Sequence, residues 1–210
     1  MKIKLSFNNN VLETKELSIE RIEKLLNFKF IPSLKYINWK TERKVKKLYA
    51  KAYTKGLIDP LALWLGKFHK KDLIGQLMNS LALCWTGPHI GYGVFAKDRI
   101  AKWQFIGEYA GILRPRKVFW KDENDYCFRY PLPFISLNHL TIDSEESGNL
   151  TRFINHSDNP NAESIGVFHN GIFRVIIRAT KDITVGEEIT YHYGPLYWKH
   201  RKKFPELTPK

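Results

Sequence analysis

Cysteine is scarce in this 210-residue chain, which has only Cys84 and Cys127. Two cysteines far apart, outside any Cys-x-x-Cys pattern, build neither a disulfide framework nor a cysteine zinc cluster. Long apolar runs are also missing, since no segment approaches the roughly 18 residues of a membrane-spanning helix and the first residues lack a signal-peptide core. We therefore expect a cytoplasmic or nuclear protein with no membrane partner. Export without a classical signal peptide is the alternative.

Positive charge dominates, with 34 Lys and Arg against 21 Asp and Glu. The excess lies in the flanks: residues 1–90 carry a net charge of +10, residues 91–195 carry −1 and residues 196–210 carry +4. A basic flank favours contact with nucleic acid or acidic protein surfaces, and a near-neutral centre with acidic side chains suits a cationic peptide. A solvated, lysine-rich helical face explains the flank equally well.

The first 80 residues show helical signals. Apolar residues at helical spacing follow Ser18, a typical N-cap, and Thr41 is the candidate N-cap of a lysine-rich helix. Asp59-Pro60 combines an N-cap with a proline at the first helical position, and Asp72 begins a fourth short helix. These signals predict a basic, mainly helical N-terminal region over residues 1–80.

The residue pattern changes near residue 81. Short runs rich in β-branched and aromatic residues alternate with Gly, Pro, Asn and Asp, which is typical of many short strands. His169-Asn170-Gly171 predicts a hairpin, because Asn-Gly readily takes the positive φ values of a type I′ turn. We expect an α+β protein with a β-rich domain over residues 81–195 and an aromatic, basic tail over residues 196–210.

Five strings in the β-rich segment carry the functional signal. They are Gly-Tyr-Gly-Val-Phe-Ala at 91–96, Ile-Gly-Glu-Tyr-Ala-Gly at 106–111, Tyr-Cys-Phe-Arg at 126–129, Gly-Asn followed by Arg-Phe-Ile-Asn-His-Ser at 148–157, and Gly-Glu-Glu-Ile-Thr-Tyr-His-Tyr-Gly at 186–194. Each alone is weak, but in this order they resemble a SET domain, the catalytic module of many protein lysine methyltransferases. The resemblance implies small curled β-sheets in which the Asn-His-Ser segment and the C-terminal segment form a pseudoknot.

The resemblance implies methyl transfer from S-adenosylmethionine to the ε-amine of lysine. Tyr193 matches the catalytic tyrosine, whose hydroxyl orients the methyl donor and the lysine nitrogen. Such a displacement requires aligned reactants and a neutral amine, which desolvation in a narrow aromatic channel favours. Tyr109 and Phe128 match residues that line this channel, and a purely structural role is the alternative.

The resemblance also implies a donor pocket. The Asn155 side chain and the His156 backbone match donor-holding groups, and glycines in the Gly-Tyr-Gly turn let backbone approach the donor. The matching positions are Gly91, Tyr92, Gly93, Tyr126, Arg152, Asn155 and His156. Structural ion pairing explains Arg152, and likewise Glu188, equally well.

The sequence departs from the common family pattern at three points, which affect zinc binding and the closure of the lysine channel. Asp158 stands where many members have a zinc-binding cysteine, and residues 196–210 contain no cysteine, so we predict no metal site. The channel then needs another closure, for which Tyr197, Trp198 and Phe204 offer apolar area, unless they simply pack on the core. His192 replaces a frequent aspartate, and both a surface and a pH-sensitive histidine fit this position.

Tyr191 occupies a position where the family alternates between Phe and Tyr, and Tyr accompanies fewer added methyl groups. We therefore predict mainly mono- or dimethylation of a basic protein such as a histone or histone-like protein. The alternatives are a catalytically silent peptide-binding module and a nucleic-acid-associated protein that acts through its basic flanks. A metal hydrolase is disfavoured because the seven histidines lack metal-ligand spacing. The substrate lysine and the oligomeric state stay open.

Overall fold

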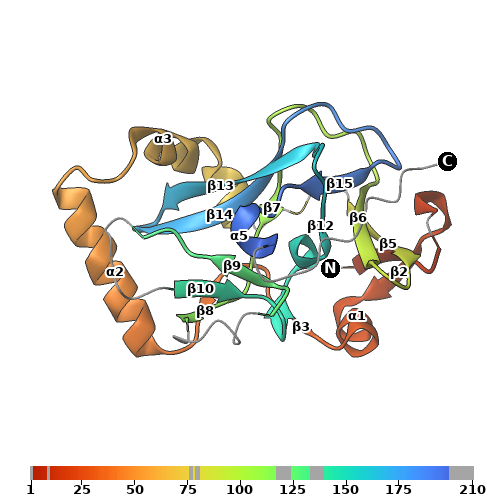
Figure 1. Cartoon of the computed structure of the whole chain (residues 1–210), viewed down its shortest axis with the longest axis horizontal. Coiled ribbons are helices and arrows are strands. Elements are labelled where there is room, and N and C mark those ends of the chain that lie inside the picture. Colours follow the sequence, from red (N-terminus) through yellow and green to blue (C-terminus); the bar gives the residue numbers. More distant parts are fainter. Residues whose placement is uncertain are drawn as a thin grey trace.

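Small sheets form the centre of the molecule, with α2 and α3 at one end and α1 at the other (Figure 1). The computed structural model describes residues 2–8, 10–75, 78, 81–116, 124–132 and 140–198. The helices are α1 (Ile19–Leu26), α2 (Trp39–Thr54), α3 (Pro60–Phe68), α4 (Lys70–Gly75) and α5 (Pro195–Trp198). Among the described residues, no helix is long and apolar enough to span a bilayer.

Four sheets contain the fifteen named strands. The largest has the order β12-β15-β6-β5-β1-β2, and the others have the orders β4-β8-β10-β9, β13-β14-β7 and β11-β3. The first eight strands are β1 (Lys2–Ser6), β2 (Lys15–Ser18), β3 (Lys29–Phe30), β4 (Lys35–Tyr36), β5 (Leu81–Gly87), β6 (Gly91–Ala96), β7 (Phe105–Glu108) and β8 (Ile112–Pro115). The remaining strands are β9 (Cys127–Arg129), β10 (Leu140–Asp143), β11 (Ser147–Gly148), β12 (Asn155–His156), β13 (Ala162–His169), β14 (Ile172–Ala179) and β15 (Glu188–Tyr191).

Local capping chemistry fixes most of the predicted helices. Ser18 caps α1 by accepting the Arg21 N–H, and Asp59 caps α3 by accepting the Leu61 N–H, as predicted. The prediction that Thr41 caps α2 is wrong, because the Asn38 side chain accepts the Thr41 N–H and the helix begins at Trp39. The fourth helix likewise begins at Lys70, two residues before Asp72.

The N-terminal region also contains four short strands that the sequence did not predict. β1 pairs in parallel with β5 and antiparallel with β2, so residues 2–18 extend the same sheet as the β-rich segment. β3 and β4 pair with β11 and β8. The expected domain boundary at residue 80 stays a prediction, but this pairing joins the N-terminal residues to the β-rich segment.

The hairpin predicted at His169-Asn170-Gly171 is present. β13 and β14 pair antiparallel around it, with φ values of 48° at Asn170 and 77° at Gly171. α3 packs on β13 through Gly66, where an added Cβ would lie 1.8 Å from the Phe168 carbonyl oxygen. This close approach holds α3 directly against the strand.

Two buried clusters meet beside the segments that carry the motifs. One lies between the large sheet and α1 and contains Tyr191, whereas the other lies beneath α2 and contains Tyr109. Phe128 packs against both clusters, and Tyr193 packs against the first. The aromatic residues of the motifs therefore gather where the two halves of the core join.

Candidate active site

The Asn-His-Ser string and the C-terminal string lie side by side. β12 runs parallel to β15, with Asn155 opposite Thr190 and His156 opposite Tyr191. β15 in turn pairs antiparallel with β6, which carries the Gly-Tyr-Gly turn. Three of the five strings thus become neighbours in one sheet.

A partly buried polar pair occupies the junction of these strands. The Asn155 side-chain amide donates a hydrogen bond of 2.7 Å to Glu188 Oε1. A Cβ at residue 93 would lie 2.5 Å from this oxygen and 3.0 Å from Asn155 Nδ2. Gly93 therefore provides the space in which the pair forms.

Glu188 makes stability at this junction depend on pH. Burial raises the pKa of its carboxyl above the ordinary value of 4.5, although the bond from Asn155 acts in the other direction. Stability is therefore lost as the pH rises through the raised pKa, because the folded state must then bury a charge. We expect Glu188→Gln to match the wild type near about pH 4, below the unfolded pKa, and to melt a few degrees higher at neutral pH. Thermal unfolding across this range measures the difference.

The adjacent Glu187 is the matched control with the opposite sign. Burial acts to raise the pKa of Glu187, but hydrogen bonds from Asn161 and Thr184 hold it below its ordinary value. Glu187→Gln should therefore lose stability relative to the wild type at neutral pH and recover it in acid. The same pH trend in both variants would contradict the assigned role of Glu188.

Tyr193 lies just after β15, and both its side-chain hydroxyl and its backbone N–H are hydrogen-bonded. Its hydroxyl donates to the Ile154 carbonyl at 2.7 Å, and its backbone N–H donates to His156 Nδ1 at 3.2 Å. Burial, with smaller contributions from neighbouring tyrosines, raises the pKa of Tyr193 well above its usual value of 10.0. The side chain therefore stays a neutral phenol at physiological pH.

Aromatic rings surround Tyr193. The Tyr191 ring lies 5.0 Å from the Tyr193 ring, and α5 adds Tyr197 at 4.6 Å and Trp198 at 6.3 Å between centroids. Trp198 also contacts the His156 ring at 4.9 Å. The structure thus brings the predicted tail residues Tyr197 and Trp198 to Tyr193, whereas Phe204 lies outside the described residues.

Tyr109 and Phe128 extend the aromatic group into the second core cluster. Their rings are 5.3 Å apart, and the Tyr109 hydroxyl donates to the Tyr126 carbonyl at 2.8 Å. Burial, followed by the proximity of Tyr109, Tyr193 and Tyr197, raises the pKa of Tyr191. The predicted channel residues are therefore neighbours of the predicted catalytic tyrosine.

Arg152 is buried and bonded to the protein itself. Its Nε and Nη2 donate to the carbonyls of Ser144 and Glu145 at 2.6 and 2.9 Å. Its guanidinium lies 3.8 Å from the centroid of the Tyr126 ring and also faces Phe28 and Phe153. These contacts favour the structural interpretation of Arg152, with its bonds going to backbone carbonyls.

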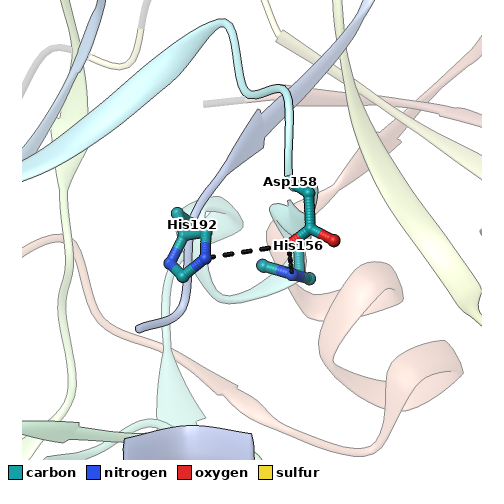
Figure 2. A group of neighbouring side chains, drawn as sticks. All are labelled: His156, Asp158 and His192. Atoms are coloured by element: carbon teal, nitrogen blue, oxygen red, sulfur yellow. Dashed lines mark hydrogen bonds and ion pairs between the residues drawn. The ribbon is translucent and has the colours of Figure 1, made fainter. Parts of the chain in front are cut away.

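His156, Asp158 and His192 form a cluster (Figure 2), and the His156 ring lies 5.4 Å from the Tyr193 ring. Their ligand-type atoms lie within 4.8 Å of one another. The sequence gave no sign of this cluster, because the two histidines are 36 positions apart in the chain and come together through strand pairing. The structure also accounts for the departure at His192, since its Nδ1 accepts the Gly194 N–H at 2.9 Å, a bond that an aspartate side chain makes in an Asx turn.

The five strings lie within a segment that is similar to known proteins. A family model described as SET domain matches residues 91–194. The N-lysine methyltransferase KMT5A of Xenopus tropicalis is 32% identical over 111 residues, which cover 50% of this chain and 33% of that protein. The chain spans about a third or less of the length of the curated relatives that it matches.

Two solved structures resemble the fold. ATXR5 in complex with mono-methylated histone H3.1 aligns with a TM-score of 0.64 and 19% identity, covering 84% of this chain and 86% of that one. The ctPRC2 complex bound to S-adenosylmethionine aligns with a TM-score of 0.50 and 28% identity, covering 58% and 16%. The predicted α+β fold with small β-sheets is confirmed.

Proposed function

Residues 91–194 place this chain in the SET-domain family, and from this premise we propose that it methylates lysine side chains of a basic protein, with S-adenosylmethionine as donor. One observation carries the proposal: Tyr193 stands between the Asn155 and His156 strand and a group of aromatic rings. This arrangement provides the two halves that a methyl transfer needs, a polar donor pocket and an apolar lysine channel.

The polar half fits the donor. A Cβ at residue 93 would collide with the Asn155 and Glu188 pair, so Gly93 lets this pair lie against the β6 backbone, whereas nothing lies within 4 Å of the Cβ position of Gly91. The ctPRC2 structure, which resembles part of this chain, is bound to S-adenosylmethionine. We assign donor binding to Gly91, Tyr92, Gly93, Tyr126, Asn155 and His156, and we assign Arg152 the role of holding the Tyr126 ring. The donor supplies the electrophilic methyl group.

The aromatic half fits the lysine. Tyr109, Phe128 and Tyr191 would line the channel, and Tyr197 and Trp198 would close it. Desolvation among aromatic rings favours the neutral amine, and aromatic faces also tolerate cationic groups. Since the Tyr193 hydroxyl donates to Ile154, its oxygen keeps lone pairs to accept an amine N–H. Tyr193 would thereby orient the amine toward the donor methyl group.

Charge supports a basic substrate. Asp125, Glu145 and Glu146 are exposed near Tyr126, and they would attract a cationic segment. ATXR5, which shares the fold, forms its complex with a histone. We therefore propose a histone or histone-like protein as substrate.

A labelled methyl-transfer assay on fractionated basic proteins tests the function. We expect donor-dependent labelling of a basic protein that acid hydrolysis assigns to methyllysine. Calorimetric binding of S-adenosylmethionine without any transfer would instead identify a silent binding module. No binding of the donor at all would contradict the proposal.

Nucleic-acid contact through residues 1–80 remains the second candidate. α2 exposes basic side chains at Lys40, Arg43, Lys44, Lys46, Lys47 and Lys51, and its C-cap residue Lys55 is also exposed. Deleting residues 1–80 would remove β1 from the large sheet, so substitution of the α2 lysines is the better test. A salt-dependent affinity for duplex DNA that falls in these variants would support it.

Tyr191 sets our expectation for the number of methyl groups. Tyr191 is 6% exposed and its ring lies 5.0 Å from that of Tyr193, so its hydroxyl would take up room beside a bound lysine amine. We propose that the wild type adds mainly one or two methyl groups and that Tyr191→Phe shifts the product toward trimethyllysine. Mass spectrometry of the modified peptide measures the shift. A dominant trimethyl product from the wild type, or no shift in the variant, would contradict this role.

A further inference from the structure

The His156, Asp158 and His192 cluster is defined by which atom of each ring faces which partner. His156 Nε2 lies 3.2 Å from Asp158 Oδ1, and His192 Nε2 lies 3.7 Å from the same oxygen (Figure 2). The opposite ring atoms face the backbone: His156 Nδ1 accepts the Tyr193 N–H, and His192 Nδ1 accepts the Gly194 N–H. The two rings contact each other edge to face at 4.8 Å.

These partners determine where the ring protons lie. A neutral histidine has one protonated and one accepting nitrogen, and each Nδ1 is the acceptor. Each Nε2 therefore carries the proton and points it at the Asp158 carboxylate. The Asp158 carboxylate thus orients the His156 ring through a hydrogen bond at 3.2 Å and lies 3.7 Å from His192 Nε2, and the two rings hold two consecutive backbone N–H groups.

The same geometry disfavours a metal ion at the cluster, although the residue types suit zinc. A metal would need the lone pairs of both Nε2 atoms, which moves the ring protons to Nδ1. A metal-bound histidine normally donates this second proton to a carboxylate or carbonyl. Here each Nδ1 would instead face the N–H of Tyr193 or Gly194.

We propose that Asp158 and His192 are positioning residues for Tyr193. Asp158 fixes the His156 ring, His156 holds the Tyr193 N–H, and His192 holds the next N–H along the chain. The cluster would thereby fix the backbone that carries the catalytic hydroxyl. The inference rests on the proposed role of Tyr193 in methyl transfer.

We call the hold of the His156, Asp158 and His192 cluster on the Tyr193 and Gly194 N–H groups the clamp. Nitrogen-15 NMR of the histidine rings in the full-length protein tests the clamp independently of activity. We expect the Nε2–H tautomer at both His156 and His192. Asp158→Ala should remove this preference at His156 and shift the Tyr193 amide signal. An Nδ1–H tautomer at either ring in the wild type would overturn the proposal, as would an unchanged Tyr193 amide in Asp158→Ala.

Kinetics test the positioning role. Because a misplaced catalytic group lowers the rate of the chemical step, Asp158→Ala should reduce kcat about tenfold while KM for the substrate is retained. His192→Ala should lower kcat, and His192→Asn should restore most of the loss, since its side-chain oxygen can accept the Gly194 N–H. Asp98→Ala, which removes another exposed carboxylate, is the matched control. A raised KM with an unchanged kcat in Asp158→Ala would overturn the positioning role.

Metal analysis distinguishes the clamp from a zinc centre formed by the same three residues. We expect the purified protein to contain less than stoichiometric zinc and to keep its melting temperature in the presence of a chelator. One zinc per chain that is lost in Asp158→Ala would overturn the clamp in favour of a metal centre. If the wild type transferred no methyl group, the proposed function would fail, whereas the NMR result would still decide the clamp.

Discussion

Tyr193→Phe should reduce methyl transfer by at least about 100-fold, as expected when one oriented hydrogen-bonding group is removed from a catalytic site. The hydroxyl is the group that changes, because the ring contacts with Tyr191, Tyr197 and Trp198 are kept. The variant also loses the bond to the Ile154 carbonyl, at a cost of about 1 kcal/mol in unfolding free energy. Single-turnover assays with labelled donor measure the rate, and denaturant unfolding measures the stability.

Tyr130→Phe is the matched control. Tyr130 is a buried tyrosine whose hydroxyl, like that of Tyr193, donates to a backbone carbonyl, here that of Phe173 at 2.8 Å. It should lose a similar amount of stability and keep its methyl transfer. Activity that falls equally in the two variants would show that the loss at Tyr193 is structural, and near-full activity in Tyr193→Phe would refute its catalytic role.

Features encoded in a few consecutive residues were predicted from the sequence. Ser18, the Asp59-Pro60 pair and the Asn170-Gly171 turn were correct, because capping and positive φ depend on local chemistry. Thr41 failed because a second capping residue, Asn38, stands three positions earlier. Local signals decide that a helix begins, but two polar residues within one turn compete for the cap.

Features that depend on distant partners were not predictable. β1 reads as Lys-Ile-Lys-Leu-Ser, too short to distinguish from a loop, and it becomes a strand because β5 lies beside it. The His156, Asp158 and His192 cluster depends in the same way on the parallel pairing of β12 with β15. Most of the predicted site residues do gather around Tyr193 or Tyr126, but the sequence gave no partner for Arg152.

Arg152→Met should destabilise the protein by about 3 kcal/mol, within the range for removing one partner of a buried charged network. Arg152 is 8% exposed, and its loss leaves the buried carbonyl of Ser144 without the donor at 2.6 Å. The Tyr126 ring also loses the guanidinium stacked against it. Arg152→Lys should recover little, because an ammonium cannot form the same planar fork between two carbonyls and a ring. Denaturant unfolding measures both variants.

Arg178→Met separates this effect from the general loss of an arginine. Arg178 also stacks on an aromatic ring, Trp103, and pairs with Glu163 at 2.7 Å, but it is more exposed. It should therefore cost less than about 1 kcal/mol. Calorimetry with S-adenosylmethionine then separates the two roles that the sequence left open for Arg152. Full stability with lost donor affinity in Arg152→Met would make Arg152 a direct donor contact, whereas the buried contacts described here require both to fall together.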